Sequence, residues 1–142
     1  LNELFQLPLT FCCTEFVLAE LNNFDHSALL ARGLLVEPLD DTAVSKLYGL
    51  MAEHNNSSLA DVSCYFLAHE TTRPLLTGDG RLRKQAQKNG LEVHGALWLL
   101  DRLVEHAVIP TTRAADCLES MLLKNARLPH AECQIRLQQW RA

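Results

Sequence analysis

The stretch PLLTGDGRLRKQA, from Pro74 to Ala86, decides the predicted fold. Its apolar start predicts a buried strand that ends at Thr77 and Asp79, and Gly80 then opens a pattern typical of a helix. This order of strand, acid and helix is typical of open parallel α/β sheets, which bind ligands just beyond the carboxyl ends of their strands. Asp79 is therefore the first candidate for a functional site.

The same alternation of strand and helix extends along the chain. Thr14 and either Asp40 or Asp41 are in position to cap helices, and Gly90 is in position to end one. Short connections between strands and helices predict a three-layer α/β/α fold with a mainly parallel central sheet, in one domain over residues 1–142. Strands are predicted over residues 9–14, 34–39, 73–77 and 91–95, and helices over residues 1–7, 14–21, 41–54, 59–67, 80–89, 96–106, 114–124 and 129–140.

Composition and charge exclude several classes of protein. A chain of 142 residues with 48% hydrophobic and 21% charged residues is typical of a globular domain and not of a disordered one. The net charge of −4 gives no general attraction to nucleic acid, so such a partner needs a local basic patch. No apolar run reaches the roughly 18 residues of a membrane span, and we expect a cytoplasmic protein. Five cysteines without a C-x-x-C pair favour neither a disulfide framework nor a zinc site.

Three acids, each near the end of a predicted element, are candidate ligands of a hard divalent cation. Asp61 is the fourth residue of Ser58-Leu59-Ala60-Asp61, a capping-box pattern, so it can also simply complete the start of a helix. Asp79 can be a turn residue or helix N-cap, and Glu20 can be a solvated surface acid. Because they follow three different strands of a parallel sheet, we expect the three carboxylates to converge at one sheet edge.

Basic residues follow Asp79 directly. Arg81, Arg83, Lys84 and Lys88 lie on a predicted helix that contains no acid. They can form a solvated face in which cations complement the helix dipole, or a patch that guides phosphates toward the acids.

Four motifs give the chain a resemblance to the PIN domain nucleases, a family that includes the toxins of many toxin–antitoxin pairs. The resemblance covers nearly the whole chain and depends on the order and spacing of the motifs. They are V-L-A-E-L around Glu20, L-A-D-V-S-x-x-x-L-A around Asp61, L-L-T-G-D-x-x-L-R-x-x-A around Asp79, and G-x-L-W-L-L from Gly95.

The resemblance implies a Mg²⁺- or Mn²⁺-dependent endoribonuclease. By their places in these motifs, Glu20, Asp61 and Asp79 match acidic positions that bind the metal and take part in catalysis in this family. Thr77 matches a hydroxyl residue often found beside the last acid. Members of the family usually begin with a central strand that ends in an Asp, and no such strand precedes Leu1. We therefore expect the native protein to include a further N-terminal strand with the first acid.

The resemblance also implies partners: an RNA substrate, bound with the help of Arg81, Arg83 and Lys84, and an antitoxin protein or a second copy of the chain. The apolar stripes of the last two predicted helices are either core or an interface for such a partner. Two other functions stay open, a catalytically inactive PIN-like module that binds RNA or protein, and a different small α/β phosphoryl-transfer enzyme. The chain has neither G-x-x-x-x-G-K-[ST] nor G-x-G-x-x-G to support nucleotide binding.

Overall fold

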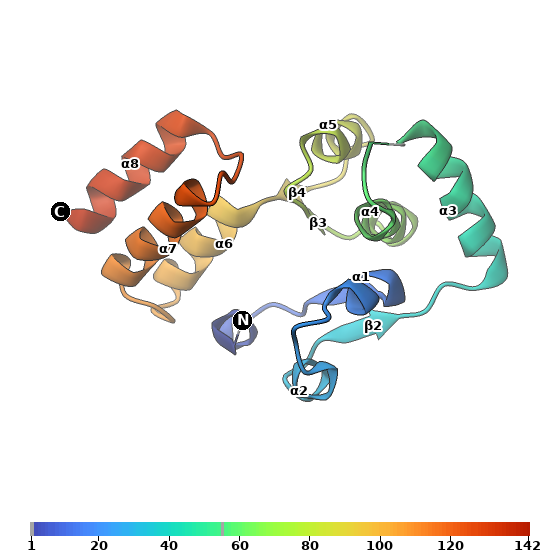
Figure 1. Ribbon diagram of the computed structural model, residues 1–142, viewed down its shortest axis with the longest axis horizontal. Coiled ribbons are helices and arrows are strands. Elements are labelled where there is room, and N and C mark those ends of the chain that lie inside the picture. Colours follow the sequence, from blue (N-terminus) through green and yellow to red (C-terminus); the bar gives the residue numbers. More distant parts are fainter. Residues whose placement is uncertain (1, 55) are drawn as a thin grey trace. The chain divides into compact units, whose positions relative to one another are not determined.

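The computed structural model describes residues 2–54 and 56–142, which form helices joined by short strands (Figure 1). The chain divides into two compact units, one of residues 9–94 and one of residues 1–8 together with 95–142. The prediction of a single domain over residues 1–142 stays a prediction. The larger unit contains β1 (Cys12–Thr14), α1 (Glu15–Glu20), α2 (His26–Ala31), β2 (Leu35–Glu37), α3 (Asp41–Glu53), α4 (Leu59–Thr71), β3 (Leu75–Leu76), α5 (Gly80–Lys88) and β4 (Val93–His94).

The strands pair in parallel, as predicted, but in two separate sheets. β1 pairs with β2, with Cys13 opposite Val36, and β3 pairs with β4, with Leu75 opposite Val93. Each pair is joined through helices, as parallel strands require. The mixed α/β class is thus confirmed, whereas one central sheet is not present in the described part of the chain. The three-layer arrangement and the additional N-terminal strand stay predictions.

Polar caps start the main helices of this unit. Asp40 accepts a hydrogen bond from the Ala43 backbone N–H over 2.7 Å and so begins α3, as predicted. Gly90, at φ +77°, follows the last turn of α5 in the left-handed conformation that glycine tolerates best. Thr14 precedes α1 but forms no cap with its side chain. Its hydroxyl lies 2.6 Å from the Ser63 hydroxyl of α4, so the predicted cap is wrong and a buried link between β1 and α4 takes its place.

Some predicted boundaries are wrong. Residues 2–6 form a short 3₁₀ helix, η1, within the helix predicted over residues 1–7. Helix α2, whose N-cap Asp25 accepts a hydrogen bond from the Ala28 backbone N–H, was not predicted from the sequence. Pro129 is the N-cap of the last helix and not its first helical residue. Asn55, between the helices predicted over residues 41–54 and 59–67, lies outside the described residues.

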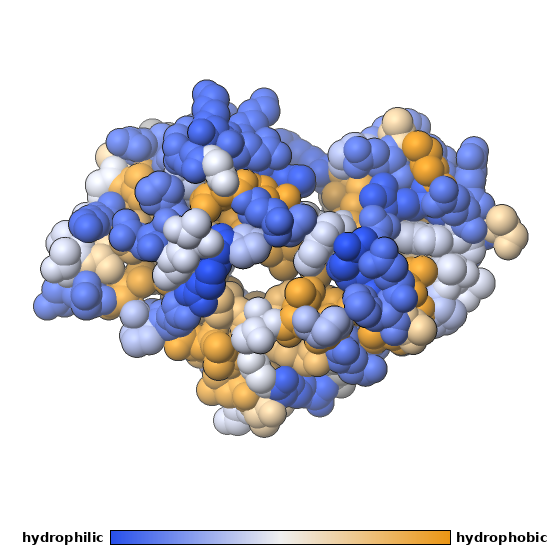
Figure 2. Space-filling view, turned by 180° about the vertical axis from the view of Figure 1, so that it is seen from behind, coloured by the Kyte–Doolittle hydropathy of each residue, from blue (hydrophilic) through white to orange (hydrophobic). Residues whose placement is uncertain are grey.

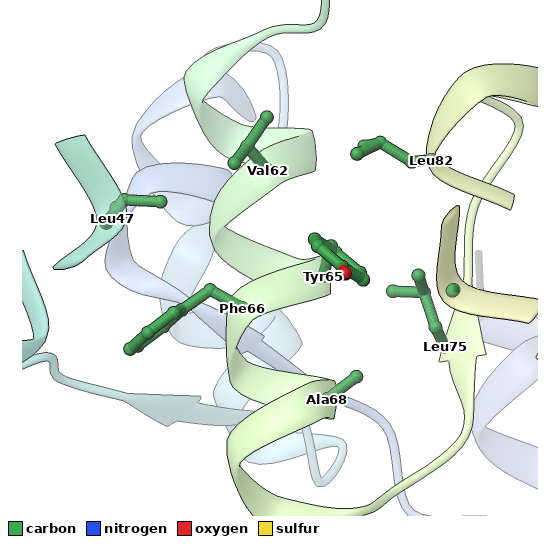
Figure 3. Close-up of a cluster of buried hydrophobic side chains, with 8 residues drawn as sticks. Leu47, Val62, Tyr65, Phe66, Ala68, Leu75 and Leu82 are labelled. Carbon is green, nitrogen blue, oxygen red and sulfur yellow. The ribbon is translucent and has the colours of Figure 1, made fainter. Parts of the chain in front are cut away.

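Helix α4 forms the centre of the larger unit. It contacts α1, α3, α5, β1 and β3, and its side chains Val62, Tyr65 and Phe66 are buried. Figure 3 shows Phe66 on the side of α4 that faces Leu47 of α3, and Tyr65 on the side that faces Leu75 of β3. This helix therefore lies in the interior of the larger unit. The buried cluster comprises Leu47, Val62, Tyr65, Phe66, Ala68, Leu75, Leu82 and Ala86.

The smaller unit is helical. In addition to η1 it contains α6 (Ala96–Glu105), α7 (Thr111–Leu123) and α8 (His130–Arg141). Helices α7 and α8 pack together, and Leu118, Cys133 and Trp140 from their apolar stripes are buried. Of the two alternatives for the apolar stripes, core or interface, the first is confirmed for these three residues. Arg136 of α8 donates to both carboxylate oxygens of Asp101 on α6, over 2.8 and 2.7 Å.

Large apolar side chains also reach the surface. Phe24, Leu30, Leu35 and Tyr48 are all at least two-fifths exposed. On the face shown in Figure 2, hydrophobic side chains form separate patches between hydrophilic ones. Within the described residues, no helix combines the length and the hydrophobicity needed to cross a bilayer.

Truncation of Leu47 tests the importance of the core around α4. Leu47 is 0% exposed, so Leu47→Ala should lower the free energy of unfolding by about 2–5 kcal/mol, through lost burial and the cavity left behind. Leu123, which is 84% exposed, provides the matched control, and Leu123→Ala should change stability by no more than about 0.5 kcal/mol. Urea unfolding followed by circular dichroism measures both, and equal losses would contradict this description of the core.

Candidate active site

Asp79 lies where β3 ends and α5 begins. The Thr77 backbone N–H donates to the His94 carbonyl over 3.0 Å and extends the pairing of β3 with β4. The Thr77 hydroxyl accepts from the Asp79 backbone N–H over 3.1 Å, which fixes the turn after the strand. Asp79 Oδ1 then accepts from the backbone N–H groups of Arg81 and Leu82, over 3.0 and 3.2 Å. Asp79 is therefore the N-cap of α5, and the predicted order of strand, acid and helix is confirmed.

The second oxygen of Asp79 is held by the start of the neighbouring helix. Ser57, just before α4, donates its hydroxyl to Asp79 Oδ2 over 2.6 Å. Partial burial alone would raise the pKa of the Asp79 carboxyl. The hydrogen bonds from Ser57 and from the Leu82 and Arg81 backbones, with the positive charge of Arg81, outweigh that effect and lower this pKa below its ordinary value. Asp79 is thus held in its ionised form.

Asp61 occupies the first turn of α4. Its backbone N–H donates over 3.1 Å to the hydroxyl of Ser58, the N-cap of the helix. The predicted cap is confirmed, and the Asp61 carboxylate is exposed near the positive end of the helix dipole. This position stabilises a negative charge there.

Two adjacent serines connect the two acids. Ser57 binds the carboxylate of Asp79, while Ser58 caps the helix turn that carries Asp61. The structure therefore places the starts of α4 and α5, with one acid each, at neighbouring positions. Ser57 was not among the predicted site residues, because its polar surroundings are typical of a loop. The only sequence feature that could have indicated its role is its position directly before the helix N-cap Ser58. Serines at such positions have many different partners, so this feature is not specific.

Glu20 is exposed at the last residue of α1. Among residues 2–54 and 56–142, no group of three or more His, Cys, Asp or Glu side chains is arranged to hold a metal ion. The convergence of Glu20 with Asp61 and Asp79 stays a prediction. The two aspartates supply oxygen ligands of the kind that Mg²⁺ uses, since this ion keeps several waters and needs only one or two carboxylates together with substrate phosphates. The donor set thus fits an incomplete oxygen site.

The basic side chains of α5 differ from most arginines elsewhere in the chain in their lack of ion pairs among the described residues. Arg73, Arg113 and Arg136 form ion pairs with carboxylates, at N–O distances of 2.5 to 2.7 Å. No ion pair is found in the described part of the chain for the basic side chains of α5. These basic side chains are Arg81, Arg83, Lys84 and Lys88. Arg81 and Lys84 are exposed and Arg83 is half-buried, so their positive charges are accessible to an anion.

Three of the five cysteines are poor candidates for a nucleophile. All five are free. Burial raises the pKa of the Cys64 thiol to about 11, so this residue is protonated at neutral pH. Burial likewise raises the pKa of Cys13 and Cys133.

Removal of the Ser57 hydroxyl tests its effect on Asp79. In Ser57→Ala, the pKa of the Asp79 carboxyl should rise, because a donor to its ionised form is lost. A lowered pKa in the folded state stabilises the fold above the unfolded value of about 3.9, and this stabilisation disappears as the pH falls through the folded value. The variant should therefore have less of this stability above the unfolded value, and the loss of the remainder should be complete at a higher pH than in the wild type.

Titration of the carboxyl carbon by NMR measures this pKa. The control is Ser58→Ala, which removes the α4 cap and about 1 kcal/mol of stability but leaves the donors to Asp79 in place. An unchanged pKa of Asp79 in Ser57→Ala would show that the hydrogen bond has no electrostatic effect.

Comparison with known proteins agrees with this geometry. The model of a family described as a PIN domain matches residues 1–142. No curated protein and no solved structure matches the chain. PIN domains are generally nucleases that use divalent metal ions, and the acids at the starts of α4 and α5 are consistent with that chemistry. Because the match spans the whole chain, the protein belongs to the PIN domain family.

Proposed function

We propose that this protein is a metal-dependent endoribonuclease that cleaves phosphodiester bonds of RNA. The observation that carries the proposal is the position of Asp79. Its ionised carboxylate is fixed between the N-termini of two helices, at the head of a helix that is basic along its length. A site of this kind combines carboxylates for a hard cation with cations for a phosphate backbone.

The residues have separate roles in this proposal. Asp61 and Asp79 would hold the cation, and Glu20 would complete the set. The cation, Mg²⁺ or Mn²⁺, would activate water and stabilise negative charge on the scissile phosphate. Thr77 positions Asp79 through the hydrogen bond from the Asp79 backbone, and Ser57 keeps the Asp79 carboxylate ionised and oriented.

Arg81, Arg83 and Lys84 would bind the RNA backbone. In a chain of net charge −4, RNA is attracted only where positive charge is concentrated. The absence of ion pairs on α5, among the residues that the structure describes, leaves this helix as such a place. We place the activity in the cytoplasm, where the RNA substrate is found.

Membership of the family also supports a role as the toxin of a toxin–antitoxin pair. In this proposal an antitoxin, or a second copy of the chain, would cover exposed apolar side chains. Leu123 of α7 and Ile135 of α8 are 84% and 54% exposed, and they are candidates for that contact.

One observation favours a second function. The described residues do not form a group of three metal ligands, which fits a PIN-like module that binds RNA or protein without cleaving it. Under this alternative, α5 would still bind RNA, and removal of the acids would leave that binding unchanged or make it stronger.

Neutralisation of the two aspartates separates these functions. Asp61→Asn and Asp79→Asn should each lower the rate of Mn²⁺-dependent cleavage of single-stranded RNA by about 100-fold or more, because a charge that stabilises the transition state is lost. Asparagine also caps helices well, so Asp79→Asn should keep α5 folded. Gel analysis of end-labelled RNA gives the rates, and circular dichroism confirms the fold.

Asp41→Asn provides the matched control, since Asp41 is an exposed acid in the first turn of α3. This variant should cleave RNA at the wild-type rate. RNA retained but not cut by the wild type would favour the binding module. Equal cleavage by all of these variants would exclude the proposed site.

A further inference from the structure

A cleft lies in the unit of residues 9–94, between α3, α4 and α5. This cleft has a volume of about 470 Å³, and neither Asp61 nor Asp79 lines it. The buried rings of Tyr65 and Phe66 contribute to its apolar lining, and polar side chains from all three helices complete it. Clefts of a few hundred Å³ with apolar walls and a few polar groups are typical of small-ligand sites.

Three rings lie close together along the cleft. The centroid of the Tyr65 ring lies 5.8 Å from that of His54, in an edge-on arrangement, and 6.2 Å from that of His69. Asn89 Nδ2 donates to the Tyr65 hydroxyl over 2.6 Å, which fixes the Asn89 amide at the rim. His69 is exposed. Its ring therefore offers a stacking surface to a planar ligand, beside a positioned amide.

The charges of the cleft favour a base over a phosphate. Its acidic and basic side chains, the histidines apart, are Glu53, Glu70 and Lys46. Two carboxylates against one ammonium group repel an anion. Carboxylates do accept hydrogen bonds from exocyclic amino groups, such as N4 of cytosine. The lining thus fits a planar, uncharged ring that carries an amino group.

One face of α5 connects the cleft to the candidate active site. Arg81, Gln85 and Asn89 follow one another at intervals of four residues, so they lie along the same side of the helix. Gln85 and Asn89 line the cleft, while the backbone N–H of Arg81 binds Asp79. The rise from Asp79 to Asn89 is about 15 Å. A single RNA strand can span this distance with its phosphates along α5.

We propose that the cleft binds one unpaired, amino-bearing base of the RNA strand whose backbone follows α5 to Asp79. The base stacks on His69 and forms hydrogen bonds with Gln85 and Glu70. This inference rests on the proposed function insofar as that function names RNA as the substrate. It adds a specificity site for a base some nucleotides away from the bond that is cut.

The test measures binding alone, in EDTA, so that cleavage plays no part. Fluorescence anisotropy follows the full chain with fluorescein-labelled ten-nucleotide oligo(rC) or oligo(rU), two probes of equal charge. Wild-type protein should bind oligo(rC) more tightly. His69→Ala and Gln85→Ala should each weaken oligo(rC) binding by about tenfold, with an unchanged salt dependence. Glu70→Gln should remove the preference for oligo(rC).

Three further variants serve as controls. His69→Phe keeps a ring and should keep the affinity. Gln87→Ala changes an exposed amide of α5 that does not line the cleft, and it should bind as the wild type does. Arg81→Ala should weaken both probes alike and reduce the slope of log affinity against log salt by about 1. Thermal unfolding confirms that each variant is folded.

Wild-type affinity for oligo(rC) in His69→Ala and Gln85→Ala would overturn the inference, as would equal losses for the two probes or no binding of either probe by the wild type. If the wild type cleaves RNA with metal while the cleft variants bind RNA normally, the proposed nuclease activity stands and base binding in the cleft is excluded. If RNA binding depends on the cleft but no RNA is cleaved, base binding in the cleft stands and the proposed nuclease activity is excluded.

Discussion

The burial of α4 is the constraint on which the rest of the larger unit depends. This helix presents apolar side chains to α3 on one side and to β3 and α5 on the other. Val62 is fully buried, and Tyr65 and Phe66 are almost so. A helix enclosed in this way has a fixed start as well as a fixed axis. The acid in its first turn, Asp61, is therefore positioned by the core and not by a flexible loop.

The Ser57–Asp79 hydrogen bond connects the buried helix α4 to the candidate site. Asp79 ends β3 and caps α5, so its backbone is already fixed by both elements. The bond from Ser57 over 2.6 Å then connects it to the start of α4. Two helix N-termini thus share one carboxylate, whose pKa is lowered by the groups that orient it. The hydrogen bonds that orient the Asp79 side chain are therefore the same ones that keep it ionised.

Local chemistry made much of this site predictable from sequence. The strand before Asp79 and the capping serine before Asp61 are short-range features, and both are confirmed. Side-chain contacts between distant segments were not predictable. The Thr14 hydroxyl was expected to cap α1, yet it meets Ser63 of α4 instead, because a buried hydroxyl takes whichever partner the packing provides. Ser57 was missed for the same reason.

The extent of the sheet was also not predictable from local patterns. Apolar runs of five or six residues gave strands of only two or three, because regular pairing depends on a neighbouring strand and not on the run itself. The short helix α2 contains few residues beyond one turn, so its periodicity is weak. Glu20 was placed correctly near a helix end, but its distance to the other acids depends on the packing of α1.

The central claim is that the starts of α4 and α5 together bind a divalent cation. Addition of Mn²⁺ to ¹⁵N-labelled protein tests it most directly, since the paramagnetic ion broadens the amide resonances nearest to it. The account predicts selective broadening of amides around Asp61 and Asp79, with loss of that broadening in Asp79→Asn. Broadening centred elsewhere, or none that differs between the two proteins, would contradict it.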